Sequence, residues 1–106
     1  MDTVIIDVGK DFSVAPAGRN LSDGPNSGER FRKDFLVPAL KENRHILIKL
    51  DTAEGYGSSF LEEAFGGLVR EEGFSAKLLS TLLDFETIDA NLVPEIQQYI
   101  LEAQSK

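Results

Sequence analysis

The segment Glu54–Val69 reads EGYGSSFLEEAFGGLV and lies shortly after an apolar run, Ile46–Leu50 (ILIKL). The β-branched run predicts a strand, and the turn-forming residues of Thr52–Gly57 predict a loop that leaves it. Ser59 and Glu62 have the spacing of a capping box, in which a serine oxygen and a carboxylate each bind an orphan amide. We therefore predict a strand, a turn and a helix with Ser59 at its N-cap.

This corner has a chemical consequence, because the first amides of a helix lack intrahelical acceptors and carry the positive end of the helix dipole. A hydroxyl or a bound anion there is stabilised. Gly55 and Gly57 favour a tight turn over a phosphate-binding loop, since no Lys-Ser or Lys-Thr pair follows them.

Two further elements are predicted upstream. Thr3–Val8 (TVIIDV) is typical of a strand that ends at Gly9. Ser27 is a candidate cap for a helix that extends to about Glu42, whose apolar residues recur at the spacing of one buried face. Pro38 removes a hydrogen bond inside that helix, so we expect a kink or a restart near Val37.

The second half of the chain predicts three more elements. Phe74–Ser80 favours a short helix, and Leu82–Thr87 favours an edge strand because polar residues occupy alternate positions. A last helix is expected to begin near Asp89 or Asn91, with Pro94 in its first turn. Gly66 and Gly67 inside the helix after Ser59 are costly, and close backbone packing would compensate for them.

The order of these elements predicts an α/β fold, a small mixed β-sheet covered by helices. At 106 residues and 42% hydrophobic content, the chain is expected to form a single domain over residues 1–106.

The charge balance narrows the classes of partner. Eleven basic and 18 acidic residues give a net charge of -7, and the pI is about 4.6. This charge disfavours nucleic acid and an anionic membrane as partners. The absence of cysteine excludes disulfides and thiolate metal sites. With neither a leader pattern at Met1 nor an apolar run of membrane-spanning length, we expect a cytoplasmic protein.

The loop of residues 13–28 is a second candidate site, because it is rich in turn formers and long for so small a domain. A short strand near residues 12–14 is a further expectation. Arg19, Arg30 and Arg32 flank this loop, and guanidinium groups make forked hydrogen bonds to anions and carboxylates. We expect exposed charge at Arg30 and Lys33, and at Arg19 either a ligand contact or a link to Asp23 or Glu29.

Residues 51–69 resemble the central strand, serine loop and helix of STAS domains, the fold of bacterial anti-sigma factor antagonists. A fuller pattern is similar to a bacterial STAS-like family of unknown function, and it spans nearly the whole chain. It comprises Phe12-Ser13, Pro16, Gly18-Arg19, Asp23-Gly24-Pro25, Ser27-Gly28-Glu29, Phe31-Arg32 and Ser59 to Leu68.

The resemblance implies a STAS-like fold and a serine switch. In the antagonists, a partner kinase phosphorylates the second serine of a pair, which here is Ser59, with Ser58 beside it. Phosphorylation dissolves the complex with that kinase, which is also the anti-sigma factor. Gly57 and Phe60 stand where those antagonists carry aspartate and glycine.

Few residues of the sequence point to catalysis or to metal binding. His45 is the only histidine, and we interpret it as a strand-end residue rather than a base or ligand. The neighbouring pairs Glu62-Glu63 and Glu71-Glu72 diverge by about 100° on a helix, which suits solvated faces better than a metal site or an acid–base pair. We expect no catalytic residue, no metal and no cofactor.

We therefore expect a non-catalytic regulatory module that binds a signalling protein, and the STAS resemblance implies a histidine-kinase-like ATPase as that partner. The alternative is a sensor of a small anion or nucleotide at the same helix N-terminus. The predicted contact residues come from two places. One is the glycine-rich loop of residues 12–29, and the other is the turn and helix start of residues 57–63, which we call the serine corner. They are Arg19, Asp23, Gly24, Ser27, Gly28, Glu29, Gly57, Ser58, Ser59, Phe60, Glu62 and Glu63.

Overall fold

The computed structural model describes residues 3–105 and contains a three-stranded sheet. Its strands are β1 (Thr3–Asp7), β2 (His45–Lys49) and β3 (Leu83–Glu86), with β2 in the middle. Both described strand pairs are parallel rather than of mixed direction. The edge place of β3 is confirmed, as is the α/β fold. Met1, Asp2 and Lys106 lie outside the described residues.

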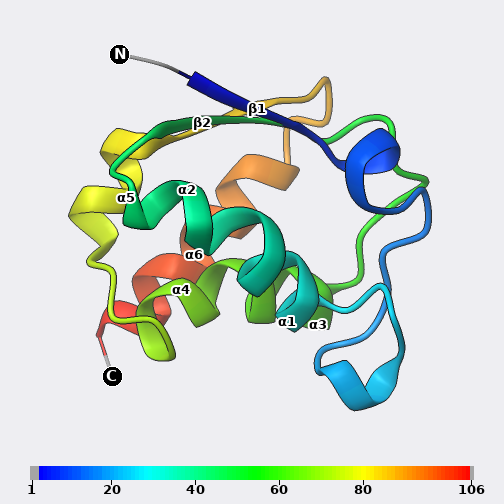
Figure 1. Ribbon diagram of the computed structural model, residues 1–106, viewed down its shortest axis with the longest axis horizontal. Coiled ribbons are helices and arrows are strands. Elements are labelled where there is room, and N and C mark those ends of the chain that lie inside the picture. The colour runs from blue at the N-terminus through cyan, green and yellow to red at the C-terminus, as the bar shows by residue number, and fades with distance from the viewer. Residues whose placement is uncertain (1–2, 106) are drawn as a thin grey trace.

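The helices lie on one side of this sheet. Figure 1 shows the sheet at the top with α1, α2, α3, α4 and α6 beneath it. On the covered face, Ile6, Ile46 and Ile48 are buried, whereas Ile5 on the other face is 56% exposed. The core therefore lies between the sheet and the helices.

The first long helix is continuous but changes its hydrogen bonding. It consists of α1 (Gly28–Phe31), the π-helical segment η3 (Arg32–Leu36) and α2 (Val37–Lys41). Ser27 is the N-cap, as predicted, and its side chain accepts a hydrogen bond from the Arg30 amide. α-Helical hydrogen bonding resumes at Val37, which confirms the restart expected from Pro38.

The second long helix has the same design: α3 (Ser58–Leu61), the π-helical segment η4 (Glu62–Gly66) and α4 (Gly67–Arg70). Its N-cap is Gly57, whose carbonyl accepts a hydrogen bond from the Leu61 amide at 3.1 Å. The prediction of Ser59 as N-cap is therefore wrong. Ser59 lies inside the first turn, and the Glu62 carboxylate is held by arginines instead of closing a capping box.

The remaining elements follow the predicted order. α5 (Ala76–Leu82) is capped by Ser75, and α6 (Leu92–Gln104) begins after Asn91. Leu92, Ile96 and Ile100 of α6 face the core.

The segment near Phe12 differs from the expectation of a short strand. It forms a π-helical turn, η1 (Val8–Phe12), closed by a hydrogen bond from the Ser13 amide to the Val8 carbonyl at 2.8 Å. Phe12 leaves the strand direction and packs its ring on Phe31, Phe35 and Phe60.

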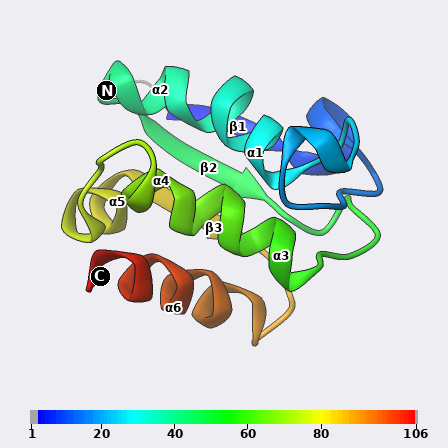
Figure 2. The ribbon, with the colours of Figure 1, turned by 90° about the horizontal axis from the view of Figure 1, so that it is seen from below.

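Close packing against neighbouring backbone or side-chain atoms explains the glycines of the long helices. A Cβ on Gly28 would lie 2.4 Å from the Phe60 carbonyl oxygen, and one on Gly67 would lie 2.2 Å from the Arg32 guanidinium. A Cβ on Gly66 would lie 3.4 Å from the Tyr99 carbonyl oxygen and closer still to the Glu62 carboxylate. The close packing expected at Gly66 and Gly67 is thus with other segments of the same chain. The two long helices and α6 lie side by side in Figure 2.

Candidate functional site

The serine pair lies at the end of the loop that leaves the carboxyl end of β2. Ser58 and Ser59 are both exposed in the first turn of α3. The loop before them is held in place, because the Tyr56 hydroxyl donates a hydrogen bond to the Leu50 carbonyl at 2.6 Å. The Glu54 amide donates another to the Val14 carbonyl at 2.7 Å, so this loop and the loop of residues 13–28 touch.

The loop of residues 13–28 is ordered by its own hydrogen bonds. The Gly28 amide donates to the Gly18 carbonyl at 3.0 Å, and the Glu29 amide donates to the Arg19 carbonyl at 3.0 Å. The Asp23 carboxylate accepts from the amides of Arg19 and Asn20. Gly18 and Gly24 have positive φ angles of 92° and 139°, which favour glycine.

Two polar residues of the predicted site thus support the loop. Asp23 stabilises its turn by binding two backbone amides. The Glu29 carboxylate accepts a hydrogen bond from the Leu21 amide at 2.9 Å and forms an ion pair with Lys33. These bonds, the Leu21 bond first, lower the pKa of Glu29. The ordered loop exposes two apolar side chains, Val14 and Leu21, each 53% exposed.

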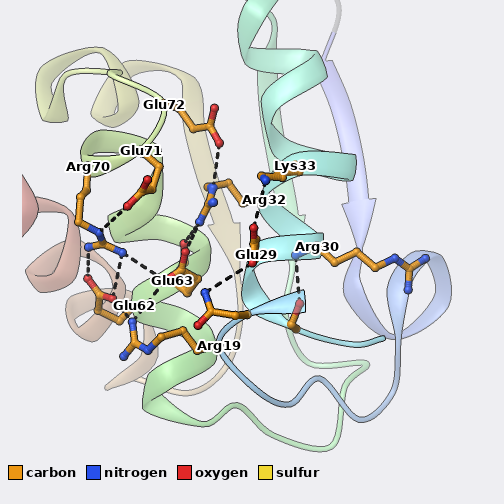
Figure 3. A network of polar contacts seen from close by, with 12 residues as sticks. Arg19, Glu29, Arg30, Arg32, Lys33, Glu62, Glu63, Arg70, Glu71 and Glu72 are labelled. Atoms are coloured by element: carbon orange, nitrogen blue, oxygen red, sulfur yellow. Dashed lines mark hydrogen bonds and ion pairs between the residues drawn. The ribbon is translucent and has the colours of Figure 1, made fainter. Parts of the chain in front are cut away.

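Arg19 joins the loop to the second long helix. Its guanidinium forms ion pairs with the carboxylates of Glu62 and Glu63, as Figure 3 shows. The expected links to Asp23 or Glu29 are therefore wrong for the side chain, although Asp23 binds the Arg19 amide. A guanidinium so paired is less available to an external anion.

Glu62 is shared between two arginines. Arg70 donates to its Oε2 at 2.6 Å, and Arg19 binds its Oε1. Partial burial acts to raise the pKa of Glu62, but the hydrogen bonds from Arg70 and Arg19 outweigh it and hold that pKa below its usual value. The same contacts with Glu62 raise the pKa of Arg19 and of Arg70.

The centre of the network is buried. Arg32, whose side chain is 2% exposed, pairs with Glu63 at 2.7 Å and with Glu72 at 3.0 Å. The expectation of solvated faces is therefore wrong for Glu63, which is 8% exposed at the side chain. Both Arg32 and Glu63 belong to π-helical segments, whose wider turns change which residues face the neighbouring helix.

Phe60 is the other correction to the predicted contact residues. It is 1% exposed and packs its ring against Phe12, Phe31 and Tyr56. A buried ring cannot contact a partner protein while the domain is folded, so Phe60 instead packs beneath the turn that carries the serines. Ser27 and Gly28 are buried as well, in a helix cap and a helix contact.

The structure thus brings Arg19, Glu62 and Glu63 together and leaves Ser58, Ser59 and Gly57 exposed beside them. Sequence reasoning missed Arg70 and Glu72 as network members, and no local spacing signals pairings across 40 residues such as Arg32 with Glu72. Leu21 was also missed, because a single apolar residue in a loop carries no signal of its own.

A family model described as a STAS-like domain of unknown function (DUF4325) matches residues 27–90. The match covers more than half of the chain, from the Ser27 cap through β3 to the following loop. The chain belongs to this family. The motif residues between Phe12 and Pro25, including Arg19, lie outside the matched part of this STAS-like domain. No curated protein and no solved structure matches the chain.

Two absences characterise residues 3–105 of the STAS-like domain. Within that range, no group of three or more His, Cys, Asp or Glu side chains is arranged to hold a metal ion. The helices of the same range are all too short or too polar to cross a membrane.

Proposed function

We propose that this STAS-like domain is a non-catalytic regulatory module that binds a signalling protein through its serine corner. The contact surface consists of the exposed residues Gly57, Ser58 and Ser59 and of the exposed side chains in the loop of residues 13–28. By its resemblance to the anti-sigma factor antagonists, we take a histidine-kinase-like ATPase as the partner class and phosphorylation of Ser59, or of Ser58 beside it, as the switch.

The observation that carries this proposal is the combination of exposed serines with an ordered, partly apolar loop. Ser58 and Ser59 lie in the first turn of a helix, where a phosphate is favoured by the helix dipole. Val14 and Leu21 are each 53% exposed in the neighbouring loop. Apolar side chains on a preorganised backbone suit protein binding, because little conformational entropy is lost on association.

The ion pairs of Arg19 with Glu62 and Glu63 couple a phosphate on Ser59 to the conformation of the contact surface. A group on Ser59 lies one helical turn before Glu62 and Glu63, at the i+3 and i+4 spacings. Its added charge of about -1.5 to -2 repels those carboxylates and competes with them for Arg19. Release of Arg19 frees the side-chain anchor of the loop, which changes the surface presented to the partner.

The test is affinity capture from the native lysate, with the wild-type domain, Ser59→Asp and Ser59→Ala side by side. Mass spectrometry identifies the bound proteins and reads phosphate on Ser58 and Ser59. We expect an ATPase that binds wild type and Ser59→Ala but not Ser59→Asp. Thr81→Asp, an exposed change on α5, is the matched control and should keep the partner.

Identical sets of bound proteins for wild type and Ser59→Asp, with no phosphate on either serine, would refute the switch. The anion-sensor alternative has a separate signature. Phosphate or nucleotide at millimolar concentration would then raise the melting temperature of wild type but not of Arg19→Gln.

A further inference from the structure

An apolar cavity lies at the outer edge of the sheet, away from the serine corner. Its volume is about 210 Å³, and it is lined by Leu79, Leu83, Phe85, Ile100 and Leu101 from α5, β3 and α6. Leu101 is 60% exposed on its rim. Figure 2 places α5 and the C-terminal end of α6 at one end of the molecule and α3, with the serines, at the other.

The backbone next to this cavity belongs to an edge strand. β3 pairs with β2 on one side, and within residues 3–105 the sheet has no strand on its other side. An edge strand presents unpaired amide and carbonyl groups, which form a template for another extended chain. The edge and the cavity are therefore available to the same ligand.

The side chains of β3 alternate in character across the sheet. Leu83 and Phe85 turn toward the helices and line the cavity. On the opposite face Asp84 pairs with His45 of β2 at 2.6 Å but keeps 61% of its side chain exposed, and Glu86 is exposed as well. Because strand side chains have a period of two, a chain added beside β3 would meet apolar and acidic positions in alternation.

We propose that β3 accepts an extended segment of a partner protein, about four residues long, in which apolar and basic residues alternate. The segment adds as a fourth strand. Its apolar side chains enter the cavity between α5 and α6, and its lysine or arginine side chains lie beside Asp84 and Glu86. The domain's net charge of -7 attracts the same basic class.

A second copy of this chain is a poor occupant of the edge. Pairing of β3 with another β3 would bring Asp84 and Glu86 close to the same carboxylates of the other copy, and like charges on neighbouring strands destabilise a sheet. The acidic row thus opposes self-association while it favours a basic segment.

The probe is a capped hexapeptide of alternating valine and lysine, titrated into the isotope-labelled domain and followed by backbone amide shifts in NMR. We expect shifts concentrated at residues 83–87 and around Leu101, and none at Ser58 or Ser59. A peptide with glutamate in place of lysine should bind about tenfold more weakly. N-methylation of alternate amides should have a similar effect, because it removes the donors that a strand needs.

Protein variants distinguish the contribution of the acidic residues Asp84 and Glu86 from that of the apolar cavity. Asp84→Lys with Glu86→Lys should weaken the lysine peptide about tenfold. Asp34→Lys, on the first long helix, combined with Glu42→Lys, directly after that helix, makes the same charge change at exposed sites and should alter affinity less than twofold. Leu101→Gln, a neutral change at an exposed position, should weaken binding at least threefold.

Three results would overturn the proposal: equal affinity for the lysine and glutamate peptides, shifts centred on β1, or a dimer whose formation depends on β3. The amide spectrum of each variant shows that it is folded, so a loss of binding cannot be confused with unfolding. Since the readout residues lie away from the serine corner, failure here leaves the proposed function untouched.

Discussion

Nη1 of Arg32 lies 2.7 Å from the carboxylate Oε2 of Glu63 and 2.7 Å from its backbone carbonyl oxygen. One guanidinium nitrogen thus binds both the side chain and the main chain of a residue on the neighbouring helix. The Arg32 and Glu63 side chains are only 2% and 8% exposed, so water compensates little if either partner is lost. The pair joins the two π-helical segments at the centre of the helical layer.

Breaking this pair should be costly. Glu63→Met or Arg32→Met is expected to lower the free energy of unfolding by about 3 kcal/mol, because each change removes the closest partner of a buried charge. Arg32 keeps its pair with Glu72, and Glu63 keeps longer contacts with Arg19 and Arg70. The double change Arg32→Met with Glu63→Met should cost clearly less than the sum of the two single methionine variants. Urea unfolding of the four proteins measures the coupling, and strictly additive costs would contradict it.

Gly67 should not tolerate a methyl group. Gly67→Ala would put a Cβ 2.2 Å from the Arg32 guanidinium, and we expect a loss of about 1–3 kcal/mol in unfolding free energy. Gly55→Ala is the control, because a Cβ there meets nothing within 4 Å. That change should be neutral or stabilise by about 0.4–1 kcal/mol. Equal melting temperatures for both variants would argue against the close helix contact.

The two serines at helix starts should behave differently. Ser27→Ala is expected to cost about 1 kcal/mol, since Ser27 is fully buried and its side chain caps the helix. Ser59→Ala should change stability by less than about 0.5 kcal/mol, because Ser59 is an exposed residue of the first turn. Thermal unfolding of both variants decides the point; a larger loss for Ser59→Ala would restore its role as a cap.

Glu62 should contribute stability that depends on pH. Its pKa is held below the usual value of 4.5 in the folded state, so its contribution is present above that pH and is lost as the pH falls through the lowered pKa. Glu62→Gln should cost about 1 kcal/mol at pH 7, as expected for partly exposed ion pairs. In urea unfolding the difference from wild type should shrink below about pH 4.5, whereas a constant difference would assign the loss to packing.

Much of the local structure follows from the sequence. The strands, the restart at Val37, the Ser27 cap and the start of α6 near Asn91 all depend on neighbours within a few residues. The edge character of β3 follows from alternation along one short segment. Such features are predictable because periodicity, caps and proline act over one or two turns.

The tertiary structure alone decided what the candidate site residues do. Arg32 and Glu63 are 31 residues apart, and Arg19 is 43 residues from Glu62. No local pattern selects these pairings. Arg32 meets Glu63 only when the two long helices pack through Gly28 and Gly67, and Arg19 meets Glu62 only when its loop lies against the second of these helices. The same packing buries Phe60 and engages Glu62 with arginines, which removes the capping box expected at Ser59. Long-range packing therefore assigned the charges their partners, since burial makes an unpaired charge too costly to keep.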